Sequence, residues 1–377
     1  MTHRDRVMLA LSHEDPDRIP VDLGATPVTG IHEQAYRVLR EYIGLPAIDP
    51  VIVNRMQQTV LPDEDVLQFL GVDVRGIFMG PIRASMCEEY PDGSYRDMWG
   101  VVRAKPPGSY YFDMVGSPLD REDLTVREVE KFPWPDYRDP AIYETIEERC
   151  RTLEGIDSAR VFNLGAAVVQ ISQFMRGYVR WYEDLILRPE LIQSIMDHIT
   201  EFHLGVAGEV LKRIGDQIDV VFFGDDLGTQ HSLQFSPEAY RSVVKPFHRK
   251  LFRFVKERSR ARVLLHSCGA IFPIVGDLVD AGVDILNPVQ VSAEGMEIEA
   301  LKRQFGKELC FWGAIDNQRV LPTGTPSDVM KAVARTVDVL GRGGGYVLCA
   351  SHNLQPGTPP ENILSMYETA RGRVEPS

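Results

Sequence analysis

The sequence predicts an eight-stranded β/α barrel, because short apolar segments alternate with helical segments about eight times along its 377 residues. Each apolar segment is a continuous run, as expected of strands that are buried on both faces of a parallel sheet. The chain is also long enough for a barrel that carries an insertion. A doubly wound open sheet is the alternative architecture.

The predicted strands are rich in apolar and β-branched residues, and helical segments separate most of them. The strands are expected at residues 18–23, 73–79, 160–164, 219–224, 262–266, 284–288, 309–313 and 345–349. The clearest helical segments cover residues 237–258, 271–281, 326–340 and 360–371.

One segment, at about residues 84–119, interrupts this alternation after the second predicted strand. Its Pro-Asp-Gly turn between alternating residues predicts an inserted β-hairpin region that lies over the carboxyl ends of the strands. Trp99, Tyr110 and Tyr111 in this insertion either wall a pocket or only pack the insertion against the barrel. We expect the whole chain, 1–377, to form a single barrel domain.

Composition excludes some functions. With 44% hydrophobic and 25% charged residues, the chain can bury a large core. A net charge of −13 with scattered basic residues argues against nucleic acid as a partner. Neither a signal peptide nor an apolar run long enough to span a membrane is evident, so we expect a cytoplasmic protein without a membrane partner. Whether it forms a homodimer is left open.

A pair of metal-binding residue types ends the fifth predicted strand. His266 and Cys268 are two residues apart, so in an extended chain their side chains point to the same face. Barrel enzymes keep their catalytic groups at the carboxyl ends of strands. Imidazole and thiolate are ligands suited to zinc.

Cys349 ends the eighth predicted strand in the same way, and closure of the barrel would bring it to the same mouth. Three ligands of the Cys₂His type with an open fourth position form an established catalytic zinc arrangement. We therefore predict zinc at His266, Cys268 and Cys349. Five cysteines are a poor disulfide framework, and the other three, Cys87, Cys150 and Cys310, are expected to be structural.

Further polar residues follow the predicted strands on the same face. We expect two of these residues to act in catalysis and the others to bind substrate, although paired acids of this kind can instead cap loops. The predicted catalytic residues are Asp226 and His352, and the predicted substrate-binding residues are Asp225, Gln230, Asn287, Gln290 and Asp316.

The sequence resembles the uroporphyrinogen decarboxylase superfamily, and its zinc-dependent corrinoid methyltransferase branch (methylcobalamin:coenzyme M methyltransferase-like) more closely than the decarboxylases. The resemblance rests on residues 13–24, on LHSCGAIFPIVGDLVDAGVDILNPVQ at 265–290, on FWGAID at 311–316 and on residues 344–368 with their TPPE. It implies a barrel fold, zinc on His266, Cys268 and Cys349, and a corrinoid (cobalamin) co-substrate carried by a partner protein.

Two departures point away from porphyrinogen decarboxylation. The loop after the first strand, GATPVTGIHEQAY, has no Arg, and Met79 and Gly80 stand where the decarboxylases carry an Asp. A substrate with eight carboxylates needs cationic partners. The expected function is therefore methyl transfer between a small methylated compound, of ether or thiol type, and a corrinoid. The alternatives are a decarboxylase of a smaller acid and a non-catalytic corrinoid- or thiol-binding protein.

Overall fold

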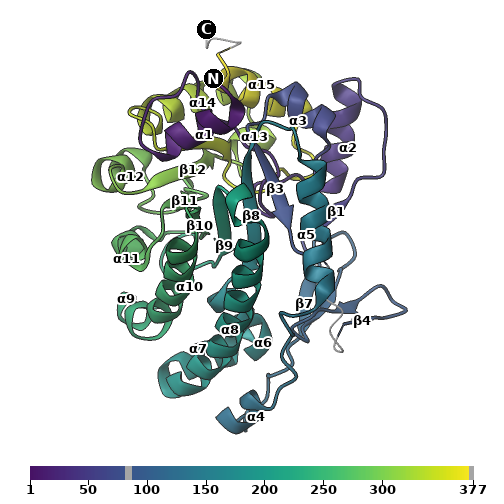
Figure 1. Cartoon of the computed structure of the whole chain (residues 1–377), viewed down its shortest axis with the longest axis vertical. Coiled ribbons are helices and arrows are strands. Elements are labelled where there is room, and N and C mark those ends of the chain that lie inside the picture. Colours follow the sequence, from purple (N-terminus) through teal and green to yellow (C-terminus); the bar gives the residue numbers. More distant parts are fainter. Residues whose placement is uncertain (81–86, 373–377) are drawn as a thin grey trace.

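A parallel sheet of seven strands forms the centre of the computed structural model, which describes residues 1–80 and 87–372. The strand order is β13-β12-β11-β10-β9-β8-β3, so strands that follow one another in this sheet are also neighbours in space. The sheet curls, and helices surround it (Figure 1), which confirms the predicted β/α-barrel class. The strands are β3 (Val74–Phe78), β8 (Ala159–Ala166), β9 (Val220–Gly224), β10 (Arg262–His266), β11 (Ile285–Asn287), β12 (Cys310–Ile315) and β13 (Tyr346–Ala350).

The helices bury their apolar faces in one continuous core with the sheet. Three short helical turns also occur, at Gly215–Gln217, Tyr240–Val244 and Phe272–Ile274. The α-helices are α1 (His3–Leu11), α2 (Glu33–Tyr42), α3 (Glu64–Leu70), α4 (Val126–Glu130), α5 (Pro140–Thr152), α6 (Val168–Arg176), α7 (Tyr178–Leu187), α8 (Pro189–Ile214), α9 (Pro237–Ala239), α10 (Lys245–Arg258), α11 (Val275–Ala281), α12 (Ile298–Phe305), α13 (Val320–Thr323), α14 (Pro326–Leu340) and α15 (Pro360–Ala370).

The barrel is closed by a segment that the sequence predicted to be a full strand, residues 18–23. In the structure this segment forms a single parallel bridge, between Val21 and Leu348 of β13. On its other side, the backbone N–H of Asp73 donates to the Val21 carbonyl over 3.0 Å. A longer ladder does not form because Pro20 has no N–H to donate, and because the Val21 N–H donates to the Asp73 side chain instead. The prediction of a regular first strand was therefore wrong.

Asp73 anchors this closing segment. Its carboxylate is fully buried and accepts hydrogen bonds from Arg6 and Arg18 and from the Val21 N–H, and it also contacts a ring nitrogen of His3. Burial by itself would raise the pKa of Asp73, but the contacts with His3 and Arg18 outweigh that effect and lower the pKa. One ionised side chain therefore joins α1, the closing segment and β3.

The insertion after β3 is a four-stranded antiparallel sheet, where the sequence predicted a hairpin region. It lies at the end of the barrel opposite to the two chain termini (Figure 1). The start of the predicted insertion, at Ala84, lies outside the described residues. That the chain forms a single domain stays a prediction. The insertion strands are β4 (Glu88–Glu89), β5 (Tyr95–Arg96), β6 (Val102–Ala104) and β7 (Asp113–Gly116), and a separate two-stranded pair is formed by β1 (Ile52–Asn54) and β2 (Thr59–Val60).

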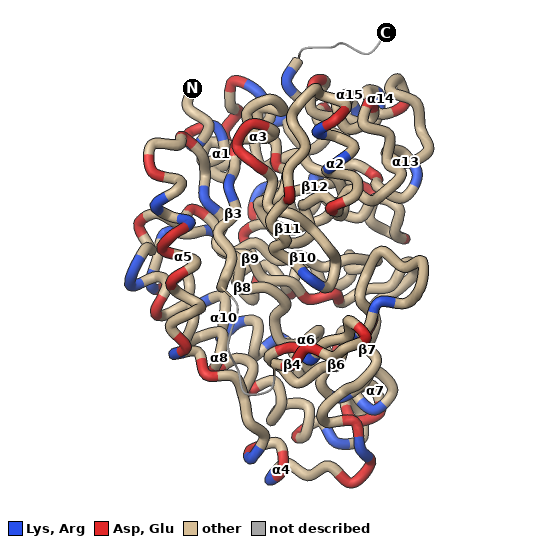
Figure 2. The backbone as a smooth tube through the Cα atoms, turned by 90° about the vertical axis from the view of Figure 1, so that its right-hand side faces the viewer, with Lys and Arg blue, Asp and Glu red and all other residues tan. Residues whose placement is uncertain are grey.

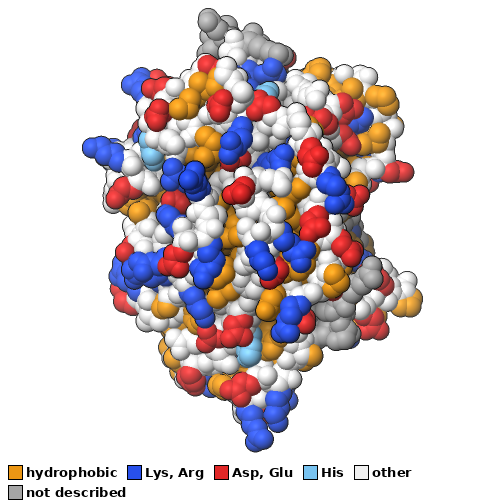
Figure 3. Space-filling model, viewed as in Figure 1, with side chains coloured by type: hydrophobic (Ala, Val, Ile, Leu, Met, Phe, Trp, Pro, Cys, Tyr) orange, Lys and Arg blue, Asp and Glu red, His pale blue; other side chains and the backbone are white. Residues whose placement is uncertain are grey.

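Charged residues of both signs alternate along the chain (Figure 2) and are intermixed on the face that Figure 3 shows. Of the helices in the described residues, none combines the length and apolar character needed to cross a membrane.

We predict that Asp73→Asn destabilises the protein by about 3–5 kcal/mol, because Arg18 loses its counter-charge and the buried Arg6 keeps only the partly exposed Asp17 as a partner. The lowered pKa means that the stabilisation by Asp73 is complete above the usual aspartate pKa of about 3.9, and is lost as the pH falls through the lower folded-state value. Denaturant unfolding of both proteins at several pH values measures the difference.

The matched control is Asp17→Asn. Asp17 also pairs with Arg6, but its side chain is 42% exposed, so the expected cost is below about 1 kcal/mol. Equal losses for the two variants would contradict the anchoring role of Asp73.

Candidate metal site and cavity

The loops that follow β9 and β10 are locked together, and they carry the residues of the candidate site. The backbone N–H of Cys268 donates to Asp226 over 2.9 Å, and the N–H of Leu227 donates to the Ser267 hydroxyl over 3.0 Å. Gly269 completes the turn with a φ of +93°, where a Cβ atom would lie 2.4 Å from the carbonyl carbon of Gly228. Only glycine fits this close approach.

His266, at the end of β10, is oriented by its neighbour on β11. Asn287 is paired with His266 in register, and its Nδ2 donates to the Trp312 carbonyl over 2.9 Å. A carbonyl oxygen only accepts, so the amide must turn its Oδ1 toward Nδ1 of His266, 2.5 Å away. Nδ1 therefore carries the proton, and Nε2 presents its lone pair.

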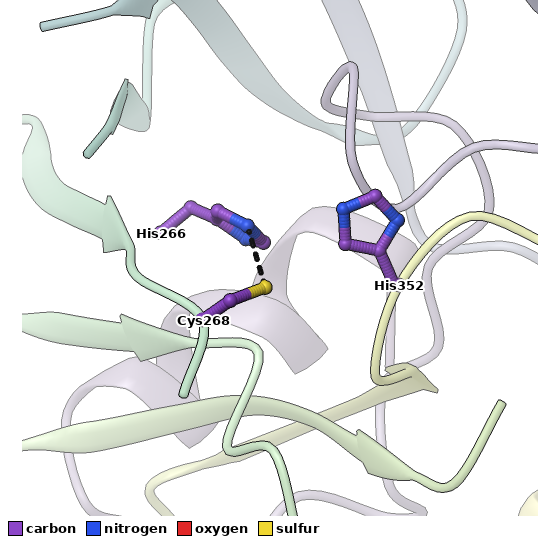
Figure 4. A group of neighbouring side chains, drawn as sticks. All are labelled: His266, Cys268 and His352. Carbon is purple, nitrogen blue, oxygen red and sulfur yellow. Dashed lines mark hydrogen bonds between the residues drawn. The ribbon is translucent and has the colours of Figure 1, made fainter. Parts of the chain in front are cut away.

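Cys268 and His352 complete a group of three potential ligands with His266. The Sγ of Cys268 lies 3.3 Å from Nε2 of His266. One ligand atom from each of the three residues lies within 4.8 Å of the others. Figure 4 shows the His352 ring reaching toward the pair from the opposite side, from the loop that follows β13.

His352 is uncharged at neutral pH. Burial, followed by the nearby His266 ring, lowers the pKa of His352 to about 4. Its Nδ1 accepts a hydrogen bond from the backbone N–H of Asn353 over 2.9 Å, which leaves the proton on Nε2. Coordination through Nε2 would move that proton to Nδ1 and break this bond, a loss that the bound metal would have to offset.

The donor set fits a divalent metal such as zinc. A thiol, two imidazoles and the adjacent carboxylate of Asp226, 3.6 Å from Nε2 of His266, are ligand types that zinc prefers. Burial, and then the negative charge of Asp226, raise the pKa of the Cys268 thiol well above its usual value. A cation at this point would balance both groups and deprotonate the thiol.

The structure differs from the sequence prediction in the third donor. Among the described residues, the group contains His352 and not Cys349. Cys349 lies within β13 and is 1% exposed. Burial, and then the charge of Asp22, raise the pKa of its thiol. Its strand position thus directs it to the barrel interior, whereas His352, two residues after the strand ends, reaches the mouth.

Most of the predicted substrate-binding residues make hydrogen bonds that hold loops together. The fully buried Asp225 accepts the N–H groups of Val168, Val169 and Gln170 at the start of α6 and contacts His248 over 2.9 Å. Its role in substrate binding stays a prediction.

Three further residues that were predicted to bind substrate also make hydrogen bonds within the loops, and their role in substrate binding stays a prediction. Gln230 and Gln290 bond to each other, and they bond to the Ser292 carbonyl and the Gly269 N–H, respectively. Asp316 accepts the N–H groups of Gln318 and Arg319. None of these residues lines the cavity described next. Asn287, also predicted to bind substrate, orients His266.

A cavity of about 410 Å³ adjoins the group of candidate metal ligands, with His266, His352 and Asp226 in its wall. The insertion contributes to this wall through Trp99, one of the three aromatic residues for which the sequence left a pocket-lining and a packing role open. Tyr110 and Tyr111 do not line the cavity and contact His32 instead. Most of the wall is apolar and aromatic, with Met56, Phe78, Trp99, Phe174, Phe202 and Phe222 among its residues.

Among the polar residues of this cavity that the sequence analysis did not single out are Arg55, Arg103, Asn163 and His203. Arg55 and Arg103 are ion-paired with Glu89 and Asp97. Asn163 did carry a signal, because it is a polar residue within an apolar strand segment. Arg55, Arg103 and His203 do not lie at the ends of predicted strands, where the sequence analysis looked for site residues.

The fold and the site together define a β/α-barrel protein of enzyme type, with potential metal ligands at the carboxyl ends of its strands. Residues 113–373 match the family described as Uroporphyrinogen decarboxylase (URO-D). The chain belongs to this family, as its sequence motifs indicated.

Individual relatives are distant. A "Uroporphyrinogen decarboxylase" of Crocosphaera subtropica is 24% identical over 184 residues, 49% of this chain and 48% of that protein. The "Methylcobamide:CoM methyltransferase MtbA" of Methanosarcina acetivorans is 24% identical over 191 residues, 51% of this chain and 52% of that protein. The match thus spans about half the length of these curated relatives. A solved "methyltransferase from Methanosarcina mazei" has the same fold, with a TM-score of 0.69, 18% identity and 99% coverage of both chains.

We predict that Asn287→Ala lowers the affinity for zinc by about 10–100-fold, because His266 loses the partner that fixes its tautomer and orientation. Competition with a chromophoric chelator measures the affinity, and thermal unfolding verifies that the variant is folded. Asn362→Ala is the control, since Asn362 is also a buried asparagine that donates to backbone carbonyls, those of Leu321 and Gly324, and it does not contact the candidate ligands. Equal zinc affinities of Asn287→Ala and the wild type would refute the orienting role.

Proposed function

We propose that the protein is a zinc-dependent methyltransferase, which moves a methyl group between a small methylated compound and a corrinoid held by a partner protein. The observation that carries this proposal is the group of His266, Cys268 and His352 at the wall of an apolar cavity. Relatives named as methyltransferases, one of sequence and one of fold, support it.

In this proposal, His266, Cys268 and His352 would hold a zinc ion, and zinc would supply Lewis acidity toward the heteroatom of the substrate. Asn287 keeps Nε2 of His266 directed to the site. Asp226 holds the Cys268 backbone in place through the hydrogen bond to its N–H. The site is thus assembled by loops that are already fixed before substrate binds, which lowers the cost of organising it.

The proposed transfer breaks the bond between the methyl carbon and an ether oxygen or thioether sulfur. The methyl group bonds to cobalt(I) of the corrinoid, which becomes methylcobalt(III), and the heteroatom gains a proton. With a thiol acceptor the same transfer runs in reverse, and the thiol proton is released. The carboxylate of Asp226 lines the cavity and is partly exposed, so we assign it to the transfer of this proton.

The decarboxylase alternative receives some support from the family itself. The arrangement of charges in the cavity argues against uroporphyrinogen as the substrate. Its two arginines, Arg55 and Arg103, already have the acids Glu89 and Asp97 as partners. A substrate with eight carboxylates would need unpaired cations.

We predict that Cys268→Ala and His352→Ala bind zinc much more weakly than the wild type and lose methyl transfer, yet stay folded. The barrel core stabilises the fold without metal, unlike a zinc finger, so each substitution should cost at most a few kcal/mol. Elemental analysis, thermal unfolding and the spectral change of cob(I)alamin on methylation are the measurements.

Cys349→Ala is the matched control, because it removes a buried thiol that lies outside the group. It should keep its zinc. Zinc loss in Cys349→Ala together with retention in His352→Ala would restore the ligand set predicted from the sequence. Wild-type protein purified without zinc, and unable to take it up, would refute the zinc proposal as a whole.

We also predict that the enzyme does not convert uroporphyrinogen to coproporphyrinogen, because the cavity arginines are already paired. Chromatography of the oxidised porphyrins, with a no-enzyme control, tests this directly. Product formed at a rate comparable to that of methyl transfer would favour the decarboxylase alternative.

A further inference from the structure

Helix α7 carries an apolar surface that the rest of the protein leaves uncovered. Val179, Ile186 and Leu187 are 73, 70 and 76% exposed, more than any other large hydrophobic residue in the described part of the chain. Each of them lies three or four residues from Glu183, so the four residues share one side of the helix. We call these four residues the α7 surface. Clustered apolar side chains that are exposed mark sites at which another macromolecule binds.

The inner face of α7 prevents the helix from turning these side chains inward. Trp181 is fully buried, and its Nε1 donates to the Ser172 hydroxyl over 2.8 Å. The buried Asp184 accepts hydrogen bonds from Arg176 and Arg188, each over 2.7 Å. A helix that is apolar on both faces is normally covered on both. Because the inner face is already packed and fixed, only a second molecule can cover the α7 surface.

The position of α7 brings this surface close to the candidate site. The ring centroid of Tyr178, the first residue of the helix, lies 6.2 Å from that of Phe174, which lines the cavity. The helix lies at the same end of the barrel as the insertion, opposite to the chain termini (Figure 1). A molecule that covers the α7 surface is therefore held beside the cavity, which is where the proposed function needs a protein-bound corrinoid.

Glu183 gives the α7 surface a negative charge among its apolar side chains. Arg180 is already paired with Asp120 over 2.8 Å, and among the described residues none forms an ion pair with Glu183. A second copy of this chain would bring its own Glu183 and a net charge of −13 to a twofold interface. Like charges that face each other across an interface cost binding free energy. A partner with a basic group among apolar side chains has the complementary charge instead.

We propose that the α7 surface is the docking site for the protein that carries the corrinoid, and that this protein presents apolar side chains and a lysine or arginine that pairs with Glu183. The inference rests on the proposed function, from which it takes the identity of the partner. A transient partner suits this position better than a permanent one, because the cavity beside it must stay open to the small substrate. A short-lived complex also needs only a modest contact area.

The test titrates each corrinoid protein of the source organism, purified with its cofactor, into the zinc-loaded protein. One of them should bind the wild type in isothermal titration, and the binding should weaken as the ionic strength rises. Ile186→Glu should weaken this binding at least about tenfold, because it places a charge in an apolar contact. Glu183→Lys should weaken it as well, because it reverses the charge that the partner complements.

Free cob(I)alamin is the second probe, and it separates docking from damage to the site. Ile186 is exposed and lies outside the cavity wall. Ile186→Glu should therefore methylate free cob(I)alamin at the wild-type rate and melt at the wild-type temperature, whereas a structural role would lower both. Val38→Glu is the matched control, because Val38 is 50% exposed on α2, at the end of the barrel that holds the chain termini (Figure 1). It should bind the corrinoid protein like the wild type.

No binding of any corrinoid protein to the wild type, or unchanged binding in Ile186→Glu or Glu183→Lys, would overturn the inference. Sedimentation that shows a wild-type dimer dissociated by Ile186→Glu would overturn it too, because a second copy would then cover α7. If free cob(I)alamin is methylated but no corrinoid protein binds, the proposed function stands and the docking site fails. If a corrinoid protein binds through Ile186 but no methylated compound supports methyl transfer, the docking site stands and the proposed function fails.

Discussion

Closure of the parallel sheet by one short segment is the constraint on which the rest of the structure depends. This segment, residues 18–23, is hydrogen-bonded to Leu348 of β13 and to Asp73 at the start of β3. The buried carboxylate of Asp73 also accepts hydrogen bonds from Arg6 and Arg18. Without this closure β3 and β13 would be free edges of an open sheet. His352 follows β13, and it would then have no fixed position opposite His266, which is the last residue of β10. The distances within the candidate metal site are thus set partly by a charge network at the other end of the strands.

The mouth of the barrel is made rigid by polar residues that take no part in the proposed chemistry. Asp225 holds the start of α6, and Gln230 with Gln290 joins the loops that follow β9, β10 and β11. Asn287 extends this framework to the site itself, because its contact with a backbone carbonyl settles which nitrogen of His266 is free. Neighbouring positions after the same strand can therefore differ in role, as Asp225 and Asp226 do.

The sequence was sufficient to predict the barrel, because buried strands leave continuous apolar runs and helices separate them. It also predicted the His266 and Cys268 pair, since two residues on one extended segment share a face whatever surrounds them. The third donor depends on where β13 ends and how the chain turns beyond it, and the sequence pattern does not encode that. A cysteine at a strand end was therefore preferred to His352 in the next loop. Residue 203 could not be placed either, because a histidine on a long helix has no motif that links it to a cavity built from distant segments.

Several buried polar residues of the barrel act as anchors. Asp73, Asp225 and Asn287 have their hydrogen-bonding capacity met by the protein, so they add rigidity. Two of them act where the candidate site is built, because Asp225 fixes the start of α6 and Asn287 orients His266. Since these contacts are made within the protein itself, the candidate metal ligands keep their relative positions without a bound ligand, which lowers the cost of organising the site.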